Sequence, residues 1–304
     1  MRVLVSGAGG LVGSALTSRL EQEDHQIVRL GRSARAGGSP PVDESGARSL
    51  TWDALNAADL EDLDAVVHLA GENVAGRRWS REQMVRIRDS RVDPTRRLCE
   101  LLARTQSRPK VVVCASGAGF YGDRGDRVCT EESPPGNGFL SDTCVEWEEA
   151  GDAARAAGIR VVHLRLGMVL SAAGGALGKM LPPFRLGVGG RIGHGRQYMS
   201  WIAIQDVVEV ILRALSDEEW SGPVNAVTPN PVTNAEFTRI LGSVLRRPTV
   251  IPVPAPVLRL LLGKMADDLL LASTRVIPQR LLDRDYPFLY PELEPCLRSL
   301  LRQA

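Results

Sequence analysis

The sequence predicts an α/β fold: a doubly wound parallel sheet with a smaller, mostly helical C-terminal lobe. Short apolar runs rich in β-branched residues alternate with longer segments of helical period as far as about residue 170. That alternation is typical of repeated βαβ units, whose parallel sheets are covered by helices on both faces. Beyond residue 170 the alternation ends, and glycine-rich turns and leucine-rich segments follow.

The expected elements follow one another in a regular order. The predicted strands are the runs VLVS, IVRL, LTW, AVVHLA, KVVVCAS and RVVHLRLGMVL. A segment rich in Gly, Pro and Ser, from Ser33 to Arg48, predicts a surface loop between the second and third strands. Helices are predicted at Leu11 to Glu23, Arg81 to Arg104, Leu140 to Ala157 and Asp206 to Leu215, and Pro223 to Val227 can add one more strand.

This order divides the chain into two predicted units. Residues 1–170, completed by about 206–228, form the sheet domain, and residues 171–205 and 229–304 form a lobe on the substrate side. The lobe is expected over the carboxyl edge of the sheet, where ligands bind in open α/β folds. Its leucine-rich run from Val257 to Leu271 either packs on the core, which we favour, or contacts a second subunit in a homodimer.

Composition narrows the classes of partner. The net charge is +1 over 304 residues, and no basic run is interleaved with aromatic residues, so nucleic acid is not an expected partner. No stretch of about twenty apolar residues and no signal-peptide pattern occurs, which favours a cytoplasmic protein that does not enter a membrane. The five cysteines form no CxxC pair and the four histidines are far apart in sequence, so no metal site is expected.

The first predicted strand runs directly into a glycine-rich turn, VLVSGAGGLVGSAL. Glycines spaced in this way permit a tight turn, let the backbone approach a pyrophosphate, and let the helix pack on the strand, while the helix N-terminus faces the phosphate charge. The turn therefore predicts a dinucleotide site. The expected contacts are Gly7, Gly9, Gly10, Leu11, Val12 and Gly13, with Leu69, Ala70 and Gly71 after the fourth strand.

The end of the second strand indicates which dinucleotide is bound. The strand ends in VRLGRS, without the acidic residue that would accept hydrogen bonds from an adenosine ribose 2′-hydroxyl. Arg32 follows instead, and a guanidinium suits a 2′-phosphate, so NADP is favoured over NAD; the alternative is a solvated loop arginine. Asp53, after the third strand, either receives the adenine amino group or caps a helix.

Several motifs together resemble the extended short-chain dehydrogenase/reductase family. They are the glycine turn, HLAG, CASGAGFYG and LRLGMVL. More narrowly, AGEN, FYGD, PFRLGVGGRIGHGRQYMSWI and RVIPQRLLDRDYPFLYPEL are similar to an atypical subgroup, the epimerase-family proteins of the YfcH type. The resemblance covers nearly the whole chain, including that subgroup's C-terminal module from about Arg247. It implies a Rossmann fold, an NADP-type cofactor and oxidoreductase or epimerase chemistry on a small molecule.

Active relatives of this family use a Ser/Thr, Tyr and Lys trio, in which the lysine lowers the tyrosine pKa and holds the nicotinamide ribose. No YxxxK occurs anywhere in this chain. By position, the missing Tyr and Lys fall on Leu140 and Cys144, or one residue earlier on Phe139 and Thr143. The atypical subgroup shares this loss.

Other side chains can then be considered for the chemistry. Tyr121 is the first candidate for the proton donor. The family's serine position falls on Ser116 or, in the other alignment of CASGAGFYG, on Gly117, and we carry over Ser116. Tyr121 can equally be an aromatic residue at the edge of the core. Further polar candidates, each with an alternative structural role, are Lys179, His194, Glu72, Asn73 and Arg165, whereas Cys144 lacks an activating basic neighbour.

Two functions are consistent with these residues. One is an NADP-dependent oxidoreductase or epimerase with a substituted proton donor, which we favour. The other is a non-catalytic NADP-binding sensor or scaffold. A further departure from the family pattern is Ala203 in SWIAIQD, where relatives more often have histidine, and this segment can simply be a packed connection to the next helix.

Overall fold

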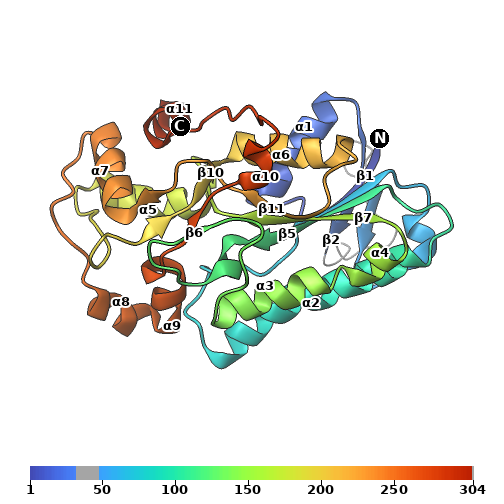
Figure 1. Ribbon diagram of the computed structural model, residues 1–304, viewed down its shortest axis with the longest axis horizontal. Coiled ribbons are helices and arrows are strands. Elements are labelled where there is room, and N and C mark those ends of the chain that lie inside the picture. The colour runs from blue at the N-terminus through green and yellow to red at the C-terminus, as the bar shows by residue number, and fades with distance from the viewer. Residues whose placement is uncertain (32–47, 303–304) are drawn as a thin grey trace, which may run out of the picture.

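The computed structural model, which describes residues 1–31 and 48–302, contains a seven-stranded parallel sheet (Figure 1). The strand order is β3-β2-β1-β4-β5-β7-β11, and every neighbouring pair is parallel. The predicted doubly wound α/β fold is therefore confirmed. The strands are β1 (Arg2–Ser6), β2 (Gln26–Gly31), β3 (Arg48–Thr51), β4 (Ala65–His68), β5 (Val111–Gly117), β7 (Arg160–Leu166) and β11 (Gly222–Ala226).

The central strands are apolar along their whole length because both faces of the sheet are covered. Alternate residues of β1 belong to different clusters: Val3 and Val5 face one helical layer, and Leu4 faces the other. In Figure 1, α1 and α6 lie on one side of the sheet and α2, α3 and α4 on the other. These helices are α1 (Leu11–Gln22), α2 (Arg81–Ala103), α3 (Phe139–Glu149), α4 (Asp152–Ala156) and α6 (Ile204–Ser216), with the short 3₁₀ turns η1 (Ala57–Leu60) and η2 (Ala118–Tyr121).

One predicted helix, Leu140 to Ala157, is in fact two. The chain is interrupted at Gly151, between α3 and α4. A Cβ at this position would lie 3.1 Å from the His163 ring on β7, so a larger residue would crowd that ring. Glycine also weakens a helix interior by about 1 kcal/mol relative to alanine. The prediction of one continuous helix was therefore wrong at this point.

The connections define a crevice at the carboxyl ends of β1 and β4. From β1 the chain continues to β2 and β3 on one side, whereas β4 leads to β5 and β7 on the other. Such a reversal of strand order is the place where open α/β folds bind ligands. At its floor, Ser6 pairs with His68 in the strand register, and the Ser6 hydroxyl is hydrogen-bonded to His68 Nδ1.

The lobe is built from short strand pairs and helices, seen at the left of Figure 1. Helix α5 packs on β8, and α11 packs on α7 around Phe237 and Leu241. The strand pairs are β8 (Met168–Ser171) with β10 (Trp201–Ala203), β9 (Tyr198–Met199) with β12 (Val232–Thr233), and β6 (Val128–Cys129) with β13 (Arg275–Val276). The helices are α5 (Gly175–Arg185), α7 (Asn234–Leu245), α8 (Ala255–Leu262), α9 (Lys264–Ala266), a π-helical turn η3 (Asp267–Leu271), α10 (Gln279–Leu282) and α11 (Leu293–Arg302).

The C-terminal segment is tied to the sheet domain by buried hydrogen bonds. The carboxylate of Asp206, in the first turn of α6, accepts hydrogen bonds from the backbone amides of Leu289 (2.7 Å) and Tyr290 (3.1 Å). Ala203 is fully buried at the end of β10, and α6 begins at the next residue. The run SWIAIQD thus acts as a packed connection into α6, as one of the two interpretations of the sequence proposed.

The leucine-rich run from Val257 to Leu271 packs on the core only in part. Leu258 and Met265 are buried, but Leu260 is 76% exposed and Leu261 62% exposed. The expectation that the run as a whole packs on the core was therefore wrong for the outer face of α8. Within residues 1–31 and 48–302, no helix combines the length and apolar character needed to cross a bilayer.

Two buried histidines predict sensitivity to acid. Burial lowers the pKa of His68 and of His163 from the usual 6.5 to about 4. Below its usual pKa each ring takes up a proton in the unfolded chain, whereas the folded protein resists protonation down to about pH 4. The free energy of unfolding should therefore fall as the pH drops through that window, by about 3 kcal/mol for each histidine. Urea unfolding at several pH values between 7 and 4.5 would measure this slope.

The slope can be assigned with two variants. His163→Leu should flatten the pH dependence because it removes one of the two buried rings. His194→Gln should leave the slope unchanged because His194 is exposed. A slope that His163→Leu does not alter would contradict the assignment.

Candidate functional site

The glycine turn between β1 and α1 lies against the end of β4. Gly7 has a positive φ of +75°, and a Cβ there would lie 2.9 Å from the amide nitrogen of Ala70. A Cβ on Gly13 would lie 2.1 Å from the carbonyl oxygen of Gly7, which is closer than real atoms approach. The two glycines therefore allow the turn, the strand end and the first helix to meet backbone to backbone.

The N-terminus of α1 is free to bind an anion. The helix begins at Leu11 after Gly10, which has no side chain to cap it, and no acidic residue occupies the first turn. The amides of Leu11, Val12 and Gly13 have no partner among the described residues, since the first amide bonded back to the turn is that of Ser14. Gly9 is exposed, and nothing lies within 4 Å of a Cβ placed on it. This open cradle fits a pyrophosphate.

At the adenosine end of the predicted site, Arg32 lies outside the described residues. Asp53 is exposed after β3, and its carboxylate has no hydrogen bond or ion pair with any described residue. The nearby 3₁₀ turn η1 is capped by Asn56, whose side chain accepts from the amide of Ala58. The helix-capping alternative for Asp53 is therefore not realised, and its carboxylate stays available to a ligand.

The segment after β4 forms the other wall of the crevice. Leu69 is partly buried against the core, and the amide of Ala70 lies against Gly7. Gly71 is exposed. Of the two polar residues that follow, Asn73 accepts a hydrogen bond from the amide of Ala75 in a local turn, and Glu72 offers its backbone carbonyl to an arginine on α2. The carboxylate of Glu72 has one long hydrogen bond from Gln83, at 3.5 Å.

Helix α3 carries the two positions where the family's tyrosine and lysine would stand. Leu140 packs against Gly119, and the Cys144 thiol donates to the carbonyl of Gly117, so these two face the end of β5. Phe139 instead packs on Trp79. Of the two registers considered, the Leu140/Cys144 pair is the one that faces the end of β5. Burial raises the pKa of the Cys144 thiol to about 11, so at neutral pH this thiol is neutral and unreactive.

Tyr121 is fully buried, with both functions of its hydroxyl in use. The phenol donates to Asn225 Oδ1 on β11 at 2.6 Å and accepts from Arg165 Nη1 at 2.9 Å. Burial raises its pKa to about 12. A phenol in this position cannot reach a substrate without breaking both bonds, so the geometry favours the second interpretation, an aromatic residue of the core.

Ser116 belongs to the same buried network. Its hydroxyl donates to Glu148 Oε1 at 2.7 Å, and Arg165 binds both oxygens of Glu148, each at 2.8 Å. Arg165 also lies over the Phe120 ring, with its Cζ 3.4 Å from the centroid. Of the two roles considered for Arg165, the structure therefore shows pairing with an internal carboxylate. The hydroxyl of Ser116 orients that carboxylate and is not directed to the crevice by any contact of its own.

The two candidates from the lobe are placed differently. Lys179 on α5 extends its ammonium group to the backbone carbonyl of Ala75, and so links the lobe to the loop after β4. His194 is exposed in a turn, where its Nδ1 accepts from the amide of Arg196. His194 thus has the turn role that was its structural alternative.

The sequence did not single out Arg91, whose side chain contacts the segment after β4 that forms one wall of the crevice. Its guanidinium approaches Gly71, donates to the carbonyl of Glu72 at 2.9 Å, and lies 5.1 Å from the centroid of the Trp147 ring on α3, the helix that carries Cys144. Arg91 was hidden in the arginine-rich run RIRDSRVDPTRR on a helix that looked like a solvated surface helix. Its contacts with Gly71 and Glu72, which only the folded structure shows, distinguish Arg91 from the other arginines of this run.

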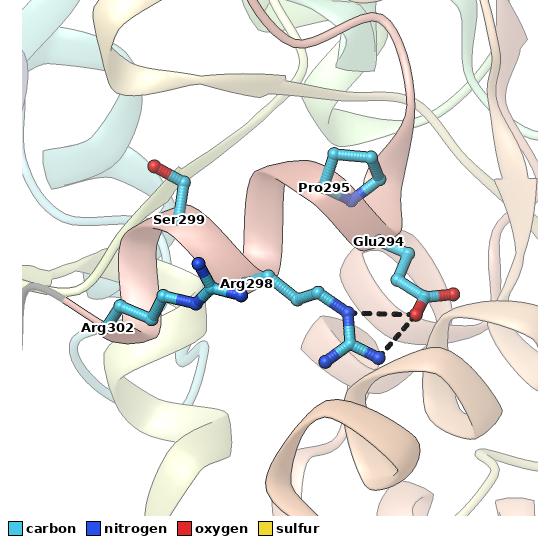
Figure 2. Close-up of a pocket in the computed structure, with 5 residues that line it drawn as sticks. All are labelled: Glu294, Pro295, Arg298, Ser299 and Arg302. Carbon is cyan, nitrogen blue, oxygen red and sulfur yellow. Dashed lines mark hydrogen bonds and ion pairs between the residues drawn. The ribbon is translucent and has the colours of Figure 1, made fainter.

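Two pockets in the described part of the chain lie away from the β1–β4 crevice. Figure 2 shows one of about 560 Å³ along a single helix, α11, where Arg298 is bound to Glu294. A second, of about 630 Å³, includes Met1 and the start of β1 at the opposite end of that strand from the glycine turn. Neither contains a predicted site residue. Within the described residues, no group of three or more His, Cys, Asp or Glu side chains could hold a metal ion.

The glycine turn makes a first prediction for the site. Gly13→Ala should destabilise the protein by about 1–3 kcal/mol or more, because its methyl group overlaps the Gly7 carbonyl and the backbone must move. Gly9→Ala, in open space, should change stability by less than about 0.5 kcal/mol. Thermal and urea unfolding of the two variants would test this, and equal effects of both would contradict the described turn.

The buried network makes a second prediction. Tyr121→Phe leaves the amide oxygen of Asn225 and one donor of Arg165 without partners, so it should lower the free energy of unfolding by about 1–3 kcal/mol. Tyr198→Phe is a matched control, since the Tyr198 hydroxyl has no hydrogen bond to a described residue, and it should change stability by less than about 0.5 kcal/mol. Loss of activity in Tyr121→Phe with unchanged stability would instead identify Tyr121 as the proton donor.

Comparison with known proteins agrees with this geometry. The model of the NAD dependent epimerase/dehydratase family matches residues 3–226, and that of a domain of unknown function, DUF1731, matches residues 253–300. The chain is 42% identical over 283 residues to epimerase family protein Mb2239 of Mycobacterium bovis, covering 92% of this chain and 90% of the relative. It is 37% identical over 306 residues to epimerase family protein SDR39U1 of Homo sapiens, covering 99% and 100%.

A solved structure covers the whole chain. The crystal structure of human epimerase family protein SDR39U1 (isoform 2) with NADPH is similar to this protein with a TM-score of 0.89 and 36% identity, over 100% of both chains. The family model spans the whole sheet domain from β1 to β11, including the glycine turn and the end of β4. The chain therefore belongs to the NAD dependent epimerase/dehydratase family.

Proposed function

We propose that this protein binds NADP(H) at the β1–β4 crevice and acts as an oxidoreductase or epimerase on a small molecule. The observation that carries the proposal is the uncapped N-terminus of α1 above Gly7 and Gly13, which forms a cradle for a pyrophosphate. The human relative SDR39U1, which matches the chain over its whole length, was crystallised with NADPH. The cofactor assigned from the sequence agrees with both.

The chain's own residues can be assigned along the cofactor. The amides of Leu11, Val12 and Gly13 bind the pyrophosphate, and the free carboxylate of Asp53 accepts a hydrogen bond from the adenine amino group. Arg32 pairs with the 2′-phosphate. The segment 69–71 then lines the half of the site that leads to the nicotinamide. NADP(H), when bound, supplies or accepts the hydride.

The substrate would lie between this half of the site and the lobe. Lys179 closes one side by reaching from α5 to Ala75. The hydroxyls of Tyr121 and Ser116 are both engaged in the buried network. A hydride transfer here would therefore draw its proton from another group or from water held against the cofactor.

That same network favours one alternative function, a non-catalytic NADP(H) sensor or scaffold. The described polar groups at the end of β5 form a closed set, with Tyr121, Arg165, Glu148 and Ser116 bonded to one another. A neutral cysteine stands where the family's lysine would be. A protein that only needs to bind the cofactor would lose nothing by these changes.

Finer assignments follow from the same features. The loss of YxxxK together with the separate C-terminal domain supports membership of the atypical subgroup of the YfcH type. All five cysteines are buried and unpaired, which supports a reducing compartment such as the cytoplasm. The exposed Leu260 and Leu261 on α8 offer an apolar surface for a second copy in a homodimer.

Cofactor preference is the direct test of the proposal. NADPH should bind the purified protein more tightly than NADH. Arg32→Ala should weaken NADPH binding by about 10- to 100-fold, because charge-assisted hydrogen bonds to the 2′-phosphate are lost, and should leave NADH binding unchanged. Fluorescence titration would measure both. Equal affinities for NADPH and NADH would contradict the assignment of NADP.

A second measurement separates the enzyme from the sensor. Stoichiometric NADPH bound to the protein can be followed at its nicotinamide absorbance while pooled small aldehydes, ketones and keto sugars are added. Oxidation that requires the protein and stops in Gly13→Ala supports the enzyme. Tight binding with no oxidation across the pools favours the sensor.

A further inference from the structure

The position left by the missing lysine is approached by a cation from another element. Arg91 lies in the middle of α2, and its side chain is partly buried between α2 and α3. Its Cζ would be 3.1 Å from a Cβ on Gly71, at the end of the β4 segment. Its Cζ lies 5.1 Å from the centroid of the Trp147 ring on α3, the helix that carries Cys144 at the position assigned to the family's lysine. One guanidinium therefore connects the nicotinamide half of the crevice to α3.

The guanidinium is held in place by backbone acceptors. Nη1 donates to the carbonyl of Ile87 and Nη2 to the carbonyl of Glu72, both at 2.9 Å. The Trp147 ring supports the group from one side, with its centroid 5.1 Å from Cζ. Because its own helix, the segment after β4 and α3 all contact it, the guanidinium has a defined orientation without a bound ligand.

Arg91 makes no direct ion pair within the described part of the chain, although the nearby carboxylate of Glu72 acts on its charge. No carboxylate there lies within ion-pair distance of it, and Nε makes no hydrogen bond to a described residue. Its burial removes part of its hydration and lowers its pKa. Arg165 is the contrasting case, since both oxygens of Glu148 neutralise it. A desolvated cation without a direct ion pair is costly in a folded chain, and a ligand that supplies oxygen acceptors lowers that cost.

We propose that Arg91 binds the hydroxyl groups of the cofactor's nicotinamide ribose, and so takes over from α2 the ribose-holding role that the family assigns to a lysine on α3. This inference rests on the proposed binding of NADP(H). It adds a residue outside the family's usual set, and it explains how Cys144 can stand at the lysine position without loss of the cofactor.

The experiment compares two ligands in isothermal titration calorimetry. NADPH contains the nicotinamide ribose, whereas 2′,5′-ADP contains only the adenosine half of the cofactor. Arg91→Gln keeps a hydrogen-bond donor near the Glu72 and Ile87 carbonyls but removes the charge. It should weaken NADPH binding by about 10- to 100-fold and leave the affinity for 2′,5′-ADP within about twofold of the wild type. Arg91→Lys, which keeps the charge, should bind NADPH more tightly than Arg91→Gln.

The control is Arg86→Gln, five residues earlier on the same helix, where the guanidinium is exposed and bound only to Gln83. It should leave both affinities unchanged. NADPH binding by Arg91→Gln within twofold of the wild type would overturn the inference, and so would an equal loss for both ligands, which would show a purely structural role. A wild-type protein that binds neither ligand would instead overturn the proposed function.

Discussion

The backbone contact between the first turn and the end of β4 is the constraint on which the rest of the site depends. Gly7 can touch Ala70, and Gly13 can touch Gly7, only because Gly7 and Gly13 have no side chain that would stand between the two backbones. The contact fixes where the N-terminus of α1 lies relative to the crevice, and so where a phosphate can sit. It also aligns segment 69–71 with α2, which brings Gly71 to Arg91.

Behind this contact, polar groups that catalysis might have used are employed in holding the sheet and its connections together. Arg165 on β7 joins Glu148 on α3 to Tyr121 at the end of β5, and Tyr121 joins Asn225 on β11. Such charge-assisted bonds are strong when all members are present and costly when one is removed. The network therefore makes the end of β5 rigid, and the crevice is left with the groups that enter it from α2, β3 and the lobe.

Much of the fold could be predicted from the sequence, because the strands are apolar runs and the turn has its own glycine pattern. The predicted helix from Arg81 to Arg104 matches α2 to within a residue. The prediction missed the break at Gly151, and the close approach of the His163 ring to this position depends on the fold and is not visible in the sequence. The same limit applies to the site. The burial of Tyr121 depends on Asn225, 104 residues later in the chain.

The way the C-terminal segment returns to the sheet domain has a consequence for how the protein is made. Residues 275–276 pair with residues 128–129, and Asn225 donates to the carbonyl of Ile277. The buried Asp206 finds its two amide partners only at residues 289 and 290. A chain synthesised from its N-terminus can thus assemble the seven strands once β11 has emerged, but several buried polar groups then await partners still inside the ribosome. The C-terminal segment therefore supplies these contacts last, and a chain cut short near residue 250 would leave Asp206 and Asn225 without them.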